Sequence, residues 1–249
     1  MKHWLASFHR LASPPIFFRL AGRIMPWSLA LAILSGGIGL VWGLVYAPAD
    51  YLQGESVRIL YIHVPAAWMS LAIWAFMAFA AIAALVWRTK VAETLAMAAA
   101  PIGACFTAIT LLTGSLWGRP TWGTYWVWDA RLTSELILLF LYLGVIGLYR
   151  TIEDPRRAAR AASVLILVGL VNLPIIRYSV EWWSTLHQPA SIRLSGSSIH
   201  PQMLWPLLVM ALATKFYFLW AVLARARMML AENESNKQWV RDLWREGRL

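Results

Sequence analysis

Long blocks without any Asp, Glu, Lys or Arg dominate the hydropathy pattern of the chain. A helix needs about 20 predominantly apolar residues to cross a bilayer. Four blocks reach that length, and they cover residues 24–49, 59–87, 94–118 and 194–214. Two shorter blocks, 136–149 and 161–176, reach it once their flanking residues are added. The pattern predicts an all-α, polytopic membrane protein with six transmembrane helices, at residues 26–46, 61–87, 93–116, 132–149, 161–179 and 203–224.

Composition supports this fold class. The 249-residue chain is 60% hydrophobic and 14% charged, whereas soluble domains are about half apolar and about a quarter charged. The first 25 residues carry scattered charges and two prolines without a clean apolar core. This argues against a cleavable signal peptide and favours an amphipathic lead-in at the membrane interface. With no repeat in view, we expect one membrane domain over residues 1–249, including a lead-in at 1–25 and a charged tail at 225–249.

The formal net charge of +10 follows the expected topology. Sixteen Lys and Arg residues lie in the N-terminal segment, the turns near residues 88–90 and 150–160, and the tail from residue 225. The connections on the other side carry only five, which are Arg58, Arg119, Arg131, Arg177 and Arg193. Since cytoplasmic loops are enriched in Lys and Arg, both termini are predicted to be cytoplasmic. The basicity thus reflects topology and does not indicate nucleic-acid binding.

One segment, residues 117–129, stands apart from the transmembrane pattern and is called the Trp segment below. It contains Gly, Pro and Thr but no long aliphatic run, and it holds four of the sixteen tryptophans, Trp117, Trp122, Trp126 and Trp128. We expect it to form an aromatic loop between the third and fourth helices, on the outer side. Tryptophan also gathers at membrane interfaces without any ligand. Four rings on a stiffened backbone nevertheless favour a ligand-binding surface.

Two histidines are predicted on the same side as the Trp segment. His63 lies in the first turn of the second helix, and His187 lies in the polar segment before the sixth. A lone histidine near a helix end is more often a hydrogen-bonding residue than a metal ligand, but two beside an aromatic surface make ligation equally reasonable. His200 is a weaker candidate because no Trp-rich motif flanks it. The single Cys105 has no partner and indicates no redox compartment.

The combined chemistry of this side suits haem. Helices 2, 4 and 6 begin there, so their N-termini add partial positive charge and free N–H groups to the arginines. Aromatic rings, imidazoles and cations match a planar, metal-bearing dianion, because porphyrin faces favour stacking and propionates favour Arg. Zinc would need three or four closely spaced ligands, which the sequence lacks. Asp129 and Glu135 have a simpler interpretation, as caps of the fourth helix or partners of Arg131.

Four stretches carry a resemblance to a known family. Residues 117–129 look like the tryptophan-rich WWD signature of haem-handling proteins, and residues 61–67, 130–135 and 172–183 are similar to the CcmC family of the bacterial cytochrome c maturation system. The similarity covers roughly residues 10–230. It implies a haem b cargo bound at the periplasmic face of the inner membrane. The implied site residues are the axial ligands His63 and His187, the Trp segment with Asp129, and Trp182 and Trp183, with Arg58 and Arg131 chosen for the propionates because they flank the motif and His63.

The resemblance also implies a function. Such a protein presents haem to the chaperone CcmE, works with the ATP-driven CcmA/CcmB transporter and the small protein CcmD, and is not itself a conventional enzyme. Two alternatives are a membrane anchor subunit that passes electrons between b-type haem and quinone, and a permease that moves haem itself. The anchor would place both ligands inside the spans. The permease would need charged or broken helices at mid-membrane, where Lys215 and a bend near Pro174 are the available hints.

Overall fold

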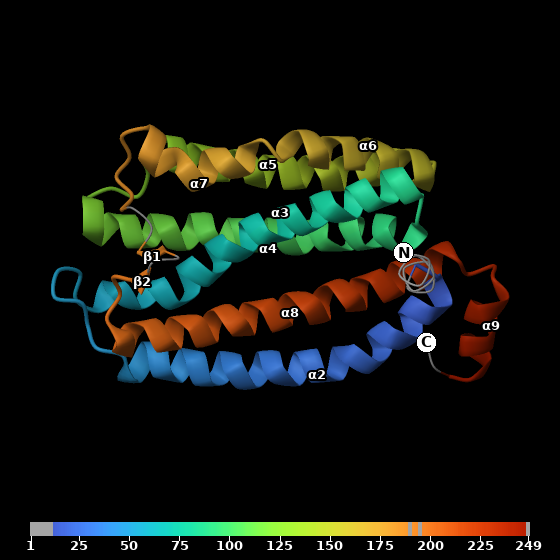
Figure 1. The fold of residues 1–249 in the computed structure, drawn as a ribbon, viewed down its shortest axis with the longest axis horizontal. Coiled ribbons are helices and arrows are strands. Elements are labelled where there is room, and N and C mark those ends of the chain that lie inside the picture. The colour runs from blue at the N-terminus through green and yellow to red at the C-terminus, as the bar shows by residue number, and fades with distance from the viewer. Residues whose placement is uncertain (1–11, 189–190, 194–195, 248–249) are drawn as a thin grey trace.

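The computed structural model describes residues 12–188, 191–193 and 196–247, and of Arg193 the backbone alone. It is an elongated bundle of long helices (Figure 1). Six helical segments among the described residues are long and apolar enough to cross a membrane: Pro14–Tyr46, Glu55–Trp87, Lys90–Trp122, Ala130–Thr151, Pro155–Trp182 and Pro201–Asn233. The prediction of a six-helix, all-α membrane protein is therefore confirmed.

The elements follow one another in a simple order. The long helices are α2 (Pro14–Val41), α3 (Leu60–Trp87), α4 (Lys90–Trp122), α5 (Ala130–Thr151), α6 (Pro155–Gly169), α7 (Asn172–Trp182) and α8 (Pro201–Asn233). A π-helical turn, η1 (Trp42–Tyr46), extends α2, and a 3₁₀ turn, η2 (Glu55–Ile59), precedes α3. The short elements are the antiparallel strands β1 (Ile192–Arg193) and β2 (Gly196–Ser197) and the helix α9 (Gln238–Arg245).

Successive spans run up and down, so the connections gather at two opposite ends (Figure 1). One end holds the α2–α3 connection, the end of the Trp segment, and the residues between α7 and α8. The other end holds the short turns after α3 and α5, the start of α2, and α9. The described members of the two groups of cations that the sequence separates thus lie at opposite ends of the bundle. We call them the Trp end and the basic end.

Helix α3 belongs to the core and packs against α4, α6 and α8. Its Trp74 is fully buried, lies 4.7 Å from Tyr142 of α5 in an edge-to-face contact, and donates a hydrogen bond from Nε1 to Ile166 O at 3.1 Å. Helices approach closely where side chains are small: a Cβ at Gly103 would lie 2.2 Å from the Tyr142 ring. Membrane helices use such small residues to maximise packing, because lipid provides no hydrophobic drive between them. This core fixes α3, α4 and α5 relative to one another.

The start of α2 differs from the sequence prediction, whereas the predicted bend near Pro174 in the fifth span is present. Helix α2 begins at Pro14 rather than at residue 26, because the charges of Arg19 and Arg23 limit the apolar span but do not interrupt helical backbone. The part of the predicted lead-in at residues 1–11 lies outside the described residues. The fifth span breaks between α6 and α7, at residues 170–171. Pro174 explains the break, because it cannot donate the helical hydrogen bond to the carbonyl four residues earlier.

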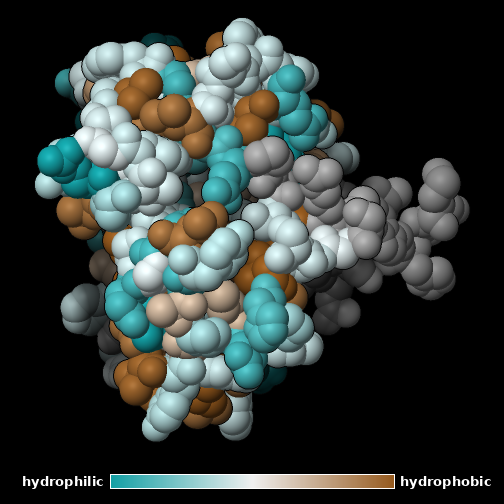
Figure 2. All heavy atoms as spheres, turned by 90° about the vertical axis from the view of Figure 1, so that its left-hand side faces the viewer, coloured by the Kyte–Doolittle hydropathy of each residue, from teal (hydrophilic) through white to brown (hydrophobic). Residues whose placement is uncertain are grey.

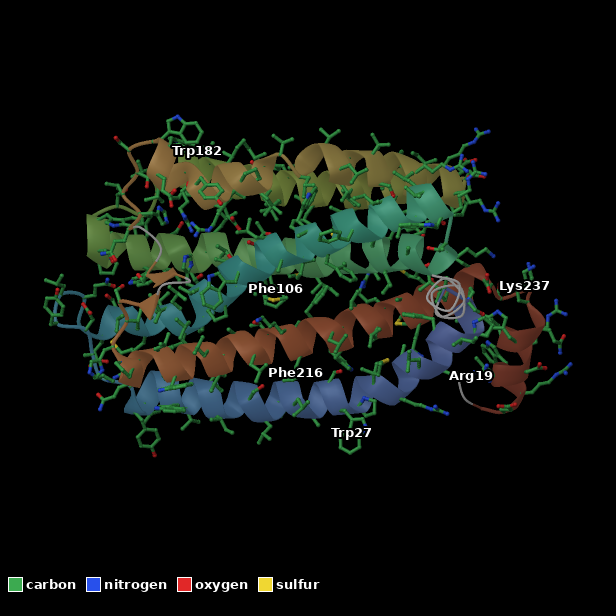
Figure 3. All side chains as sticks on the ribbon, in the orientation of Figure 1. Arg19, Trp27, Phe106, Trp182, Phe216 and Lys237 are labelled. Atoms are coloured by element: carbon green, nitrogen blue, oxygen red, sulfur yellow. The ribbon has the colours of Figure 1, made fainter. Side chains whose placement is uncertain are left out.

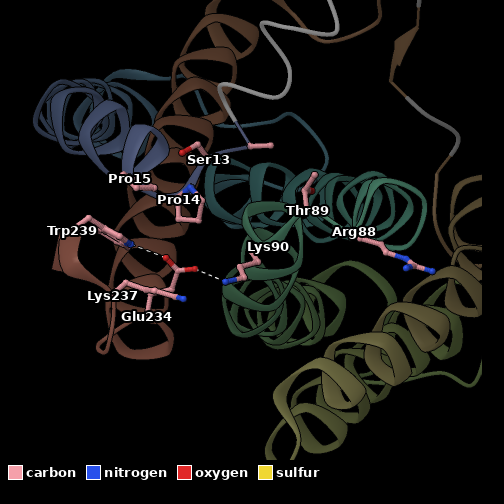
Figure 4. Close-up of a pocket in the computed structure, with 10 residues that line it drawn as sticks. Ser13, Pro14, Pro15, Arg88, Thr89, Lys90, Glu234, Lys237 and Trp239 are labelled. Carbon is pink, nitrogen blue, oxygen red and sulfur yellow. Dashed lines mark hydrogen bonds and ion pairs between the residues drawn. The ribbon is translucent and has the colours of Figure 1, made fainter. Parts of the chain in front are cut away.

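Glu234 connects the ends of α4 and α9 at the basic end through two hydrogen bonds (Figure 4). Its carboxylate accepts hydrogen bonds from Lys90 Nζ at 2.6 Å and from Trp239 Nε1 at 2.7 Å. Burial alone would raise the pKa of Glu234, but these two bonds and the charges of Lys90 and Lys237 outweigh it and hold the pKa below its ordinary value. Trp239 also packs edge-on against Phe18 of α2, with ring centroids 5.5 Å apart. These contacts fasten α9 to the helix ends beside it.

Candidate functional site

The Trp segment is only partly a loop. Residues 117–122 continue α4, and Gly123 ends the helix with a positive φ of 80° and an N–H bond to Arg119 O at 3.0 Å. A glycine in this left-handed conformation is a common helix terminator because it has no Cβ to clash. The predicted loop is therefore correct only for residues 123–129. Hydropathy marks where the apolar span stops, whereas the helix continues through Trp and Thr, which tolerate helical backbone.

The rings of the Trp segment divide between the two histidines. Trp117 lies edge-on to His63, with centroids 5.6 Å apart, and its Nε1 donates to Gln53 Oε1 at 2.8 Å. Trp122 lies edge-on to His187, with centroids 4.7 Å apart. The helical extension of α4 thus places its first and last tryptophans against different imidazoles. This arrangement brings the predicted aromatic surface and both predicted ligands into one site.

His63 is held by a chain of two hydrogen bonds. Its Nδ1 lies 3.0 Å from Thr113 Oγ1 on α4, and Thr113 donates its own proton to Ile109 O at 2.6 Å. Since the hydroxyl proton is already used, Thr113 accepts, and His63 carries its proton on Nδ1. In this tautomer Nε2 is the nitrogen that carries the lone pair. A neutral imidazole oriented through Nδ1 in this way is the usual form of a histidine metal ligand.

His187 is oriented by Asp129. Its Nδ1 lies 3.6 Å from Asp129 Oδ2, just beyond hydrogen-bond distance, and the facing carboxylate favours the tautomer with the proton on Nδ1. Burial and the charge of Arg131 lower the pKa of His187 to about 4, and Asp129 opposes only part of that shift. His187 is therefore neutral at pH 7. The other oxygen of Asp129 accepts from Leu132 N at 2.8 Å, which confirms the predicted cap of α5.

Electrostatics place one cation beside this pair. The charge of Arg131 acts on both His63 and His187, and the two imidazoles act on each other. Two buried polar atoms nearby, Trp126 Nε1 and Thr185 Oγ1, have no hydrogen-bond partner among the described residues. Buried polar groups without partners are costly and rare. Their concentration here fits a site that binds a polar-edged ligand.

Figure 2 views the Trp end along the bundle, where pale residues of intermediate hydropathy separate small hydrophilic and hydrophobic patches. The surface is therefore mixed and not a uniform apolar cap. Trp128 is 74% exposed and meets Trp126 edge-on at 5.3 Å. Two of the predicted aromatic residues thus form a pair that extends from the buried Nε1 of Trp126 towards the surface.

Four other candidate residues make contacts that do not involve His63 or His187. Arg58 donates from Nη1 to Gly43 O and Ala47 O, both at 3.1 Å, and pairs with Glu55, so it braces the α2–α3 connection. Trp182 and Trp183 are 56% and 50% exposed. Trp182 stacks on Tyr178 and points away from the bundle (Figure 3). His200 acts as the N-cap of α8, accepting from Gln202 N at 3.4 Å.

Sequence reasoning missed a buried polar link beneath the site. Glu135 accepts a hydrogen bond from Ser70 Oγ at 2.7 Å, and Tyr142 donates to Ser70 O at 2.7 Å. Glu135 therefore joins α5 to α3 and does not cap its helix. Ser70 lies two helical turns after His63, on the same face of α3. The link holds the helix of His63 against the helix that Asp129 caps, and its partners lie too far apart in the chain for any local pattern to reveal them.

Gly114 gives a test of how closely His63 is confined. A Cβ at this position would lie 3.0 Å from Cε1 of His63, so the ring would have to move by a few tenths of an ångström. We expect Gly114→Ala to displace the imidazole and lower ligand retention several-fold, measured as bound chromophore after purification. Gly37→Ala is the control, because nothing lies within 4 Å of that position. If both variants retain the same amount, His63 is not confined by α4.

The fold and these residues define a class: a polytopic helical membrane protein with paired imidazoles, tryptophans and an arginine at one end. A family model described as CcmC, heme exporter protein C, matches residues 7–241. Heme exporter protein C of Bradyrhizobium diazoefficiens is 53% identical over 94% of this chain and 87% of its own length. The protein of that name from Escherichia coli K12 is 50% identical over 95% of this chain and 96% of its own length. The chain belongs to the CcmC family.

A relative outside the bacteria is also similar. A ccmC-like mitochondrial protein of Marchantia polymorpha, named for cytochrome c biosynthesis, is 50% identical over 70% of this chain and 72% of its own length. The family resemblance inferred from the four sequence stretches is thus confirmed.

Proposed function

We propose that this chain holds haem b as cargo at the Trp end and delivers it to the chaperone CcmE. The names of its relatives, heme exporter and cytochrome c biosynthesis protein, support a role in haem handling during cytochrome c maturation. The chain is accordingly a haem-handling component of a multi-pass membrane system rather than a conventional enzyme. The finer assignments below rest on the geometry of its own residues.

The observation that carries this proposal is that both histidine rings are oriented in the same way. Each imidazole has Nδ1 directed at a protein oxygen, Thr113 Oγ1 for His63 and Asp129 Oδ2 for His187, which leaves Nε2 available. Two neutral imidazoles of this kind can occupy both axial positions of haem iron. Bound haem supplies the iron, and the chain supplies ligands whose orientation is already set. Saturating both axial positions would also limit reaction of the iron with oxygen.

The other residues take complementary roles. Trp117 and Trp122, each in contact with one histidine, would line the porphyrin, and Trp126 Nε1 is a free donor at its edge. Arg131 is our choice for a propionate, because its charge acts on both histidines. Arg58 is already bonded to two carbonyls, so we assign it to holding the α2–α3 connection. For Trp182 and Trp183, haem contact remains a prediction that this geometry does not support.

The distribution of charge suggests where the site faces. The Trp end lies opposite the basic end (Figure 1). Because the basic end is expected on the cytoplasmic side, we place haem at the periplasmic face of the inner membrane. Transport energy would come from the ATP-driven transporter CcmA/CcmB, with CcmD as a further component. In this arrangement the chain receives and presents haem without needing a path through its own core.

Haem transfer tests the proposal directly. The haem-loaded protein is mixed with the soluble domain of CcmE, and covalent haem on the acceptor is followed on a denaturing gel together with the visible spectrum. We expect haem to leave this chain and to appear on the acceptor. A chain that keeps its haem and is reduced by an added quinol would instead be an electron-transfer anchor, and a chain that purifies without colour would contradict haem binding altogether.

A further inference from the structure

A groove opens on the flank of the bundle, away from the haem-binding residues. It has a volume of about 630 Å³ and lies between α2, α4 and α8. Its walls include Ile33, Ile102, Phe106, Tyr217, Trp220 and Arg225. Phe106 lies on the side of α4 that faces α8 (Figure 3). The groove exists because α2 packs along α8 and scarcely touches α4. An apolar groove in a transmembrane surface must be filled by lipid or by another apolar partner.

One end of this groove carries a positive charge. Arg225 is exposed, and its Nε donates to Ala98 O at 3.2 Å, which fixes the guanidinium at the groove wall. Its two terminal nitrogens have no hydrogen-bond partner among the residues that the structure describes. Arg225 also marks the level where the predicted last span, residues 203–224, gives way to the basic tail. That level corresponds to the lipid headgroups at the basic end.

The length of the groove favours one kind of occupant. Along α8 the lining runs from Ala213 to Arg225, which is about 18 Å at 1.5 Å per residue. Half of a hydrocarbon core of about 30 Å is about 15 Å. The groove therefore covers one leaflet only. A partner transmembrane helix would continue along the other leaflet, whereas an acyl chain ends near the bilayer centre.

We propose that this groove binds an anionic phospholipid from the leaflet at the basic end. The phosphate pairs with the free guanidinium nitrogens of Arg225, and an acyl chain lies between α2 and α4 against Ile102 and Phe106. The lipid supplies the packing that α2 lacks on its α4 side. Bound lipid accordingly stabilises the position of α2 in the bundle, since a ligand that binds only the folded state stabilises it.

The natural cysteine provides a probe of occupancy. Cys105 is the only cysteine, is exposed, and lines the groove. In the full chain purified in detergent, we expect added phosphatidylglycerol to slow maleimide labelling of Cys105 at least about fivefold and to raise the thermal unfolding midpoint. Phosphatidylcholine should act more weakly, because its headgroup carries no net negative charge. Inorganic phosphate should have no effect, because it has no acyl chain to fill the groove.

Two substitutions test the charge. Arg225→Gln should weaken phosphatidylglycerol binding about tenfold, the order expected for loss of a charge-assisted hydrogen bond. Lys215→Gln is the matched control, because Lys215 is exposed on the same helix but does not line the groove. Native mass spectrometry counts the lipid retained by each variant.

The outcomes separate the possibilities clearly. Equal loss of lipid in both variants, or no protection of Cys105 by phosphatidylglycerol, would overturn the proposal. Protection of Cys105 only when the partner membrane subunits are present would identify the groove as a helix-docking site instead. Haem retention is read in the same samples and should not change, because the groove lies apart from His63 and His187. If the unsubstituted protein binds lipid normally but shows no haem spectrum, the proposed haem site is contradicted and the lipid site is not.

Discussion

Replacing either His63 or His187 with alanine should remove the visible spectrum of bis-imidazole haem and most of the bound haem. In the proposed site each substitution would delete one axial ligand, so the remaining histidine alone would have to retain the iron. Loss of residues that merely orient metal ligands typically costs 10–100-fold in affinity. Removing a ligand itself should cost at least as much. The measurement is the haem-to-protein ratio and the absorption spectrum of each purified variant.

The two variants should differ in how they respond to added imidazole. His63 lies on helix α3 and is bonded to Thr113 of α4, so the cavity left by alanine stays enclosed. His187 follows α7 in a non-helical connection, so that its loss also frees the contact with Trp122. Free imidazole should therefore restore the spectrum better in His63→Ala than in His187→Ala. If imidazole instead restored the spectrum better in His187→Ala, the cavity at position 63 would not be the more enclosed of the two.

His200 supplies the control for both substitutions. It is a third histidine at the Trp end, but it caps α8 and, among the described residues, makes no ring contact or hydrogen bond with His63 or His187. His200→Ala should lower the stability of α8 by about 1 kcal/mol, as for loss of an N-cap, and leave the haem spectrum unchanged. Unchanged spectra in both His63→Ala and His187→Ala would show that the ligand assignment is wrong.

Substitution of Asp129 should separate two roles of one side chain. One oxygen caps α5 through Leu132 N, and the other faces His187 Nδ1 at 3.6 Å. Asparagine is an equally good N-cap but carries no charge, whereas alanine is neither. We expect Asp129→Asn to lower haem affinity 10–100-fold with helix stability unchanged. Asp129→Ala should show the same loss and an additional destabilisation of about 1 kcal/mol. Haem titration and thermal unfolding measure the two effects.

Protonation does not explain the expected loss of affinity. Asp129 raises the pKa of His187, so removing its charge moves that pKa further below about 4. His187 then stays neutral at pH 7 in both the natural protein and the variant. The effect of Asp129→Asn must therefore arise from the tautomer and orientation of the ring. A haem affinity that recovers at higher pH would contradict this account, because a protonated imidazole would then be what weakens binding.

Asp154 is the matched control for the cap. It accepts from Arg157 N at 2.7 Å at the start of α6, at the basic end. Asp154→Ala should cost a similar cap energy of about 1 kcal/mol while leaving haem binding intact. If Asp129→Asn binds haem normally and Asp129→Ala behaves like Asp154→Ala, then Asp129 is a helix cap and nothing more.

Local patterns account for most of the fold. Charge-free blocks identified six spans, and the clustering of Lys and Arg separated the two ends, because both signals depend on each residue's own preference for lipid or water. The same signals misplaced the start of α2 and the end of α4. Hydropathy reports which residues suit the hydrocarbon core, not where a helix ends. Helices continue beyond that core at Pro14–Phe18 and at Trp117–Trp122.

By itself, the sequence determined the class of protein, its family and the side of the molecule where histidines and tryptophans gather. Only the tertiary structure decided which of these residues meet. Thr113 orients His63 across fifty positions of chain, and Asp129 at the start of α5 faces His187 in the α7–α8 connection, whereas Trp182 points outward from α7. The direction of a side chain depends on the rotation of its helix against its neighbours. That rotation is set by packing of α3, α4 and α5, which no local pattern records.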